Sequence, residues 1–171
     1  GMVNQGNLNW VALQDYSFDP TDAPALTQQY LSLWAGEIHL KNPQANLLFY
    51  APAERRDRPD SQPQIDSVFR ASASTLHATV VYTGDAWAAA SLQRPDLALY
   101  VPNDPVHPTL AGSYLTACMF YSAMYQQSPQ GLVVPTGLSD EDGAFLQDIA
   151  WRTSSLESPD PAWNPAKTTG A

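Results

Sequence analysis

Short apolar runs that alternate with stretches of helical periodicity constrain the fold of this chain more than any other feature. The runs Trp10 to Leu13, Asn46 to Tyr50 and Ala78 to Tyr82 are typical of buried strands. Between them, residues 25–41 and 64–77 carry apolar side chains three and four positions apart, which predicts amphipathic helices. Strands that alternate with helices favour a parallel sheet covered by helices on both faces, so we predict an α/β fold.

The apolar face of the first predicted helix follows from the same spacing. We expect its apolar side chains to form one stripe that packs on the sheet. They are Leu26, Tyr30, Leu31, Leu33, Trp34 and Ile38.

Three further helices are predicted in the second half of the chain. A short alanine-rich helix over 86–92 is expected to have Asp85 as its N-cap. A long apolar helix over 109–127 follows, and the hydroxyl of Thr109 is expected to cap it. The last helix is expected to begin at Ser139, because acidic residues follow in what would be its first turn.

Length and composition predict one globular domain. The chain has 171 residues, of which 44% are apolar, and a chain of this size buries roughly 70% of its unfolded surface. Because the last residues are rich in serine, proline and threonine, we expect a single domain over 1–154 and a disordered tail over 155–171.

Charge and hydropathy exclude several classes of partner. Seventeen acidic against eight basic residues give a net charge of −9, which repels the phosphate backbone of nucleic acid. No apolar run approaches eighteen residues, so no membrane span is expected.

The single cysteine, Cys118, excludes an internal disulfide and a thiolate zinc cluster. His39 and His77 have no carboxylate at ligand spacing, so we expect no metal. No signal peptide follows Met2 in this chain, and the compartment stays open.

One short motif carries a recognisable chemistry. In Asp104-Pro105-Val106-His107-Pro108, an aspartate stands three residues before a histidine, just ahead of a predicted helix. A carboxylate in this position can bind one imidazole nitrogen, fix the tautomer and leave the other nitrogen to act as a general base. The flanking prolines stiffen that arrangement.

Together with two other segments, this motif resembles the SGNH, or GDSL-type, superfamily of esterases and lipases. The segments are Leu13 to Ser17 and Gly84 to Trp87, and the matches span residues 8–151. The resemblance implies a three-layer α/β/α, mostly parallel, flavodoxin-like fold. It also implies hydrolysis of carboxylic esters, often acetyl esters on carbohydrates, without a metal or organic cofactor. The expected ligand is a small-molecule ester or carbohydrate.

Roles for individual residues follow from the same resemblance. His107 would be the general base and Asp104 its orienting partner. Gln14 or Ser17 would contact the oxyanion or the substrate, and we expect the side chains of Asp85 and Trp87 near the same ligand.

The chain departs from the family at the nucleophile. The family's Gly-Asp-Ser or Gly-Asn-Ser block, with its strand and neighbouring strand, has no counterpart here. Ser17 follows a strand and precedes Asp104 and His107 in the family's order, so it could replace the nucleophile. The alternative is a shortened, non-catalytic protein that binds a ligand or forms a homodimer covering the incomplete sheet.

Structural interpretations stand beside the functional ones. Asp104 could cap a turn while His107 lies at the surface, and Ser17 could be a turn residue after a strand. Asp85 could act only as a helix cap, and Trp87 only as a core aromatic.

The charge cluster from Glu54 to Arg58 also has two interpretations. It could be a solvated loop. Because it follows a predicted strand, Arg55 or Arg56 could instead face an anionic substrate.

Overall fold

The computed structural model describes residues 8–16 and 18–157. These residues form two compact units. The first unit holds the described residues up to Glu54 together with Arg58–Val81, and the second holds Arg55–Asp57 together with the described residues from Tyr82 onward.

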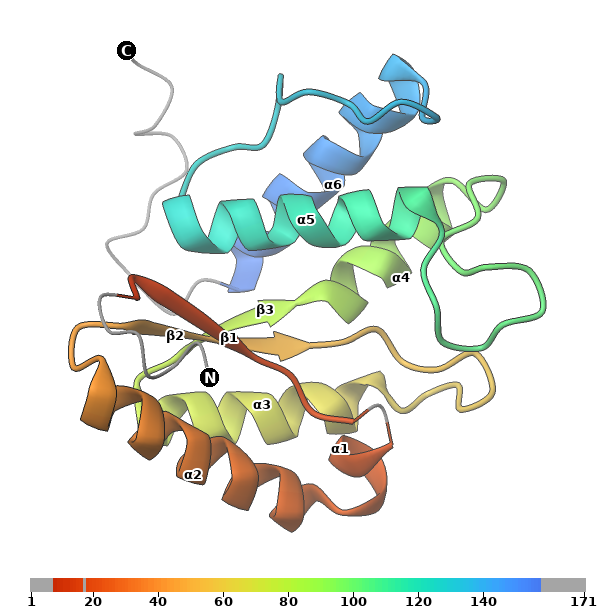
Figure 1. Ribbon diagram of the computed structural model, residues 1–171. Helices are drawn as coiled ribbons and strands as arrows, with labels where there is room; N and C mark the ends of the chain where they lie inside the picture. The colour runs from red at the N-terminus through yellow and green to blue at the C-terminus, as the bar shows by residue number, and fades with distance from the viewer. Residues whose placement is uncertain (1–7, 17, 158–171) are drawn as a thin grey trace. The chain divides into compact units, whose positions relative to one another are not determined.

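The first unit is built on a small parallel sheet. Its strands are β1 (Trp10–Leu13), β2 (Asn46–Ala51) and β3 (Thr79–Tyr82), in the spatial order β1-β2-β3 (Figure 1). Strand β1 pairs in parallel with β2, so that Trp10 lies opposite Asn46 and Leu13 opposite Phe49. The three predicted strands and the α/β class are therefore confirmed, and β1 lies at an edge of the described sheet.

Three helices belong to the first unit: α1 (Asp19–Asp22), α2 (Pro24–Lys41) and α3 (Gln62–Leu76). Helices α2 and α3 pack on each other, α2 contacts β1 and α3 contacts β2, on the lower side of the sheet in Figure 1. A proline stands in the first turn of α2 and of α3, where a residue needs no amide hydrogen. The core of this unit includes Ile38, Leu48, Phe49 and Phe69, all at most 1% exposed.

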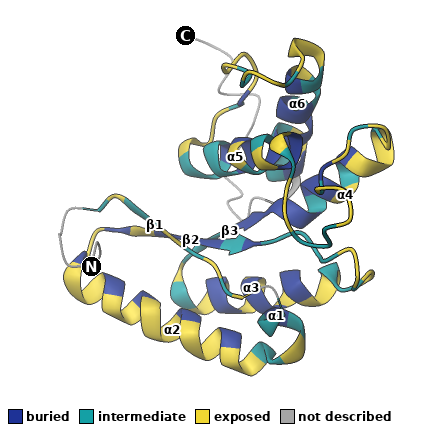
Figure 2. Cartoon of the chain, turned by 45° about the vertical axis from the view of Figure 1, so that its right-hand side comes forward, coloured by how far each residue is buried: buried dark blue, intermediate teal, exposed yellow. Residues whose placement is uncertain are grey.

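The buried face of α2 differs from our prediction. The helix buries Thr27, Leu31, Ala35 and Ile38, which are spaced by four, four and three residues. The side chains of Leu26, Tyr30, Leu33 and Trp34 are instead 38%, 46%, 56% and 54% exposed, and Figure 2 shows a continuous exposed side of α2. The helix carries two apolar stripes, and small residues at 27 and 35 let the backbone approach its neighbours closely. We call the four exposed side chains the outer face of α2.

The second unit is helical. It contains α4 (Thr83–Gln93), α5 (Leu110–Tyr125) and α6 (Asp140–Glu157), which pack on one another. Two of the three predicted caps, Thr109 and Ser139, are confirmed. Thr109 Oγ1 accepts a hydrogen bond of 3.2 Å from the amide of Gly112, and Ser139 Oγ accepts one of 3.0 Å from the amide of Asp142. The core includes Leu115, Met119, Leu146 and Ile149.

Two boundaries in this unit correct the prediction. Helix α4 begins at Thr83, directly after β3, so Asp85 is the third residue of the helix and Tyr82 is the N-cap. Helix α6 continues to Glu157, beyond residue 155 where we expected a tail to begin. Residues 158–171 lie outside the described residues.

Cys118 is buried in α5 as a free thiol. Burial raises its pKa to about 11, so the thiol is protonated at neutral pH. Within the described residues, no helix combines the length and the apolar character needed to cross a bilayer.

Candidate functional site

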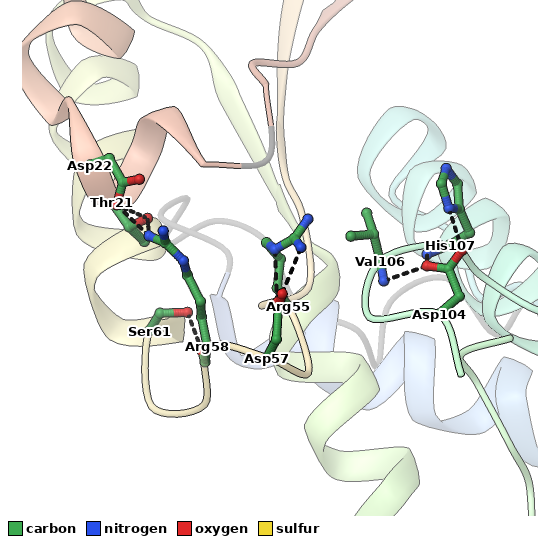
Figure 3. A network of polar contacts seen from close by, with 9 residues as sticks. All are labelled: Thr21, Asp22, Arg55, Asp57, Arg58, Ser61, Asp104, Val106 and His107. Carbon is green, nitrogen blue, oxygen red and sulfur yellow. Dashed lines mark hydrogen bonds and ion pairs between the residues drawn. The ribbon is translucent and has the colours of Figure 1, made fainter. Parts of the chain in front are cut away.

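The predicted Asp104–His107 pair forms in the loop between α4 and α5. Nδ1 of His107 and Oδ2 of Asp104 are 2.8 Å apart (Figure 3). The other carboxylate oxygen, Oδ1, accepts hydrogen bonds from the amides of Val106 at 2.8 Å and His107 at 2.9 Å. A carboxylate can only accept, so Nδ1 carries the proton in this contact, and in the neutral ring Nε2 has the lone pair.

Electrostatics favour the ionised carboxylate of Asp104. The amides of His107 and Val106, followed by the His107 ring, lower the pKa of this carboxyl to about 2. Asp104 is therefore an anion throughout the neutral range. The imidazole is 74% exposed, so water screens the pair, which orients the ring more than it stabilises the fold.

Backbone contacts fix the loop around this pair. The amide of Val101 donates to the carbonyl of His107 at 2.9 Å, and the amide of Asp104 donates to the carbonyl of Val101 at 3.1 Å. Tyr100 and Pro108 form an isolated antiparallel bridge. Asn103 takes the left-handed conformation with φ of 63°, which asparagine tolerates better than most residues. The histidine is thus held between two backbone contacts.

Trp87 packs against this loop through Tyr100. Its side chain is 5% exposed, and its Nε1 donates to Thr116 Oγ1 at 3.2 Å. The indole meets the ring of Tyr100 edge to face, with 4.6 Å between ring centroids. Since Tyr100 is bridged to Pro108, Trp87 positions the loop as a core residue. Asp85 is half-buried in the first turn of α4.

The two remaining predicted site residues belong to the first unit. Gln14 follows β1 and lines a cavity beside that strand, while Ser17 lies outside the described residues. The structure thus brings Asp104 and His107 together, whereas Gln14 belongs to a different unit from that pair.

A polar hollow beside the pair is lined in part by Arg56, whose role the sequence left open. The hollow has a volume of about 250 Å³ and is lined by Arg56, Asp57, Asn103, Asp104 and Pro105. The amide of Arg56 donates to the carbonyl of Pro105 at 3.0 Å. The sequence indicated the charge cluster from Glu54 to Arg58 as a place where an arginine could face a ligand. It did not show which arginine lines the hollow.

The first unit contains a larger, mostly apolar cavity of about 740 Å³ between the edge strand β1 and α2. Its lining includes Trp10, Leu13, Tyr30, Leu31, Trp34 and Ile38. Thr27 Oγ1 and Asp15 Oδ2, from two other lining residues, are buried without a hydrogen-bond partner among the described residues. We call this cavity the β1–α2 groove.

Residues 8–16 and 18–157 contain no group of three or more histidine, cysteine, aspartate or glutamate side chains arranged to hold a metal ion.

Comparisons with known proteins identify a fold but no family. No family model and no curated protein matches this chain. The fold is similar to the crystal structure of a DUF4886 family protein from Bacteroides uniformis, with a TM-score of 0.69 and 14% sequence identity. The similarity covers 85% of this chain and 61% of that chain. This chain thus spans less than two thirds of the length of its structural neighbour.

Proposed function

We propose that this chain is an SGNH-hydrolase-like protein with the flavodoxin-like three-layer fold of that superfamily. In this proposal, Asp104 and His107 are the general-base dyad of a carboxylic ester hydrolase. The observation that carries the proposal is the 2.8 Å contact between Nδ1 of His107 and Oδ2 of Asp104. The parallel order of the strands and the helices between them support the fold part of it.

The dyad would act by moving one proton twice. Nε2 of His107 takes the proton from an attacking hydroxyl as the new carbon–oxygen bond forms. The imidazolium then returns that proton to the leaving alcohol as the ester bond breaks, while the carboxylate of Asp104 stabilises its charge. The substrate would be a small carboxylic ester, such as an acetyl ester on a carbohydrate.

The attacking hydroxyl is either that of a serine or that of water. Among the described residues, Nε2 of His107 makes no hydrogen bond to a hydroxyl group. Ser17 is the candidate serine, and its attack would give an acyl-enzyme. Attack by water would need no nucleophilic serine, only Asp104 and His107.

Hydrolysis of p-nitrophenyl acetate tests the proposal. We expect His107→Asn to lower the rate by about 10²-fold or more, because the general base is lost. The control is His77→Asn, since His77 is an exposed histidine with φ of 53°, a conformation that asparagine accepts. Equal rates for wild type and His107→Asn would refute dyad catalysis. A matching loss in Ser17→Ala would assign the nucleophile to Ser17, and an unchanged rate would assign it to water.

The β1–α2 groove favours a second candidate function, a non-catalytic module that forms a homodimer. Strand β1 is an edge of the described sheet, and edge strands offer free backbone groups to a second strand. A two-fold axis would pair β1 with β1 of a second copy and bring the two outer faces of α2 together. Asp15 is the one charged side chain among the described residues that line the groove, so two copies of a chain with net charge −9 can approach here without strong repulsion.

Light scattering after gel filtration tests the homodimer. The expected mass is twice 18.6 kDa, and Trp34→Glu should give the monomer because it places a charge in the apolar contact. Leu92→Glu is the matched control, since Leu92 is 85% exposed on α4. A monomeric wild type would refute this candidate.

A further inference from the structure

Arg56 differs in its surroundings from four of the other five arginines. Four arginines form ion pairs with aspartates: Arg55 with Asp57, Arg58 with Asp22, Arg94 with Asp96 and Asp142, and Arg152 with Asp148. Within the described residues, Arg56 forms no ion pair. Its guanidinium carbon lies 5.8 Å from the centroid of the Tyr100 ring, a distance at which a cation is attracted to an aromatic face.

Two contacts hold Arg56 against the loop that carries His107. Its amide bonds to the carbonyl of Pro105, two residues before the histidine. Its guanidinium lies over Tyr100, which is bridged to Pro108, the residue after the histidine. The polar hollow of about 250 Å³ joins Arg56 to Asp104. The arginine therefore shares the hollow with Asp104, the carboxylate of the dyad.

One arginine and two carboxylates line the hollow, so any binding of an anion there depends on the guanidinium of Arg56. The hollow contains two carboxylates, and each already has partners: Asp57 binds Arg55 at 2.8 Å, and Asp104 binds two amides and His107. The guanidinium of Arg56 is the cation lining the hollow that no described carboxylate neutralises. It stands out in a chain whose net charge is −9.

We propose that Arg56 binds the carboxylate of an anionic ester and presents its ester group to Nε2 of His107. A guanidinium binds carboxylates through paired, charge-assisted hydrogen bonds, and the Tyr100 ring limits the number of orientations that Arg56 can take. This inference rests on the proposed function for the hydrolytic step, but the binding step is separate from it. The ligand class is a small carboxylic ester that also carries a carboxylate group.

Nuclear magnetic resonance titration with monomethyl succinate tests the binding step, with dimethyl succinate as the neutral comparison. The ring signals of His107 report binding, and released methanol reports hydrolysis. We expect the anionic ester to bind about tenfold more tightly than the neutral one, with the preference falling as salt is added. Arg56→Gln should remove this preference, while Arg152→Gln should keep it because Arg152 lies on α6, outside the hollow, and is paired with Asp148.

The outcomes separate the binding inference from the proposed function. Binding of the anionic ester that depends on Arg56, without methanol release, would support the inference and count against the hydrolase. Equal affinity for the two esters, or a preference that survives Arg56→Gln, would overturn the inference even if both esters are hydrolysed. In the His107→Asn variant, the shift of the Tyr100 ring signals should still report binding while methanol release stops.

Discussion

Replacing Gly112 with alanine is expected to lower the free energy of unfolding by about 2–3 kcal/mol. Gly112 lies in the first turn of α5. A Cβ atom there would overlap the carbonyl oxygen of Leu99 and lie 2.7 Å from Cζ2 of Trp87. The carbonyl belongs to the backbone and the indole is 5% exposed, so neither neighbour can move aside cheaply. Helix propensity alone predicts the opposite sign.

Gly36 provides the matched control for this substitution. It lies within α2, and a Cβ atom at this position meets nothing within 4 Å. Gly36→Ala should therefore raise the free energy of unfolding by about 0.5–1 kcal/mol, the usual gain for alanine over glycine in a helix. Urea unfolding followed by circular dichroism measures both variants. A Gly112→Ala protein as stable as wild type would mean that α5 does not pack this closely on Trp87.

The substitution at Gly112 should also disturb the candidate site. Trp87 contacts Tyr100, and the backbone of Tyr100 and Val101 holds both sides of His107. A displaced indole would therefore loosen the loop that carries the dyad. Packing in the helical unit and geometry at the imidazole are thus linked through one glycine.

The parts of the fold that depend on local sequence were predictable. The three strands were visible as apolar runs, and the caps at Thr109 and Ser139 were visible because a capping hydroxyl bonds an amide only three residues away. The boundary at Asp85 was wrong because β3 leads directly into α4. Asp85 resembles a cap in sequence, but the chain was already helical two residues earlier.

Other features depend on contacts that a single sequence does not contain. Helix α2 carries two apolar stripes, and packing selected the one with the small residues Thr27 and Ala35. The same limit applies to the site. Asp104 and His107 are three residues apart, so their contact followed from spacing. The contact of Arg56 with Tyr100 joins segments far apart in sequence, and nothing local distinguished it from Arg55.

Asp104→Asn is expected to reduce ester hydrolysis by about 10²- to 10⁴-fold while leaving the loop folded. The amide oxygen of asparagine can still accept the hydrogen bonds from the amides of Val106 and His107 that Oδ1 accepts now. The amide nitrogen would then face Nδ1 of His107 and donate to it. That contact requires an unprotonated Nδ1, so the proton moves to Nε2 and the general base is lost.

Nitrogen chemical shifts of the His107 ring test this reasoning independently of the rate. The neutral imidazole should carry its proton on Nδ1 in the wild type and on Nε2 in Asp104→Asn, and Asp57→Asn should leave it on Nδ1. Asp57 lines the same hollow but binds Arg55.

The pH dependence of the wild type gives the tautomer argument a further check. Because the pKa of Asp104 is lowered to about 2 from its ordinary value of 3.8, its contacts stabilise the folded state above about pH 4. That stabilisation is lost as the pH falls towards 2. The Nδ1 tautomer, wherever the ring is neutral, should therefore be independent of pH throughout the neutral range. A neutral ring that changes tautomer near pH 7 would mean that the carboxylate of Asp104 does not fix His107.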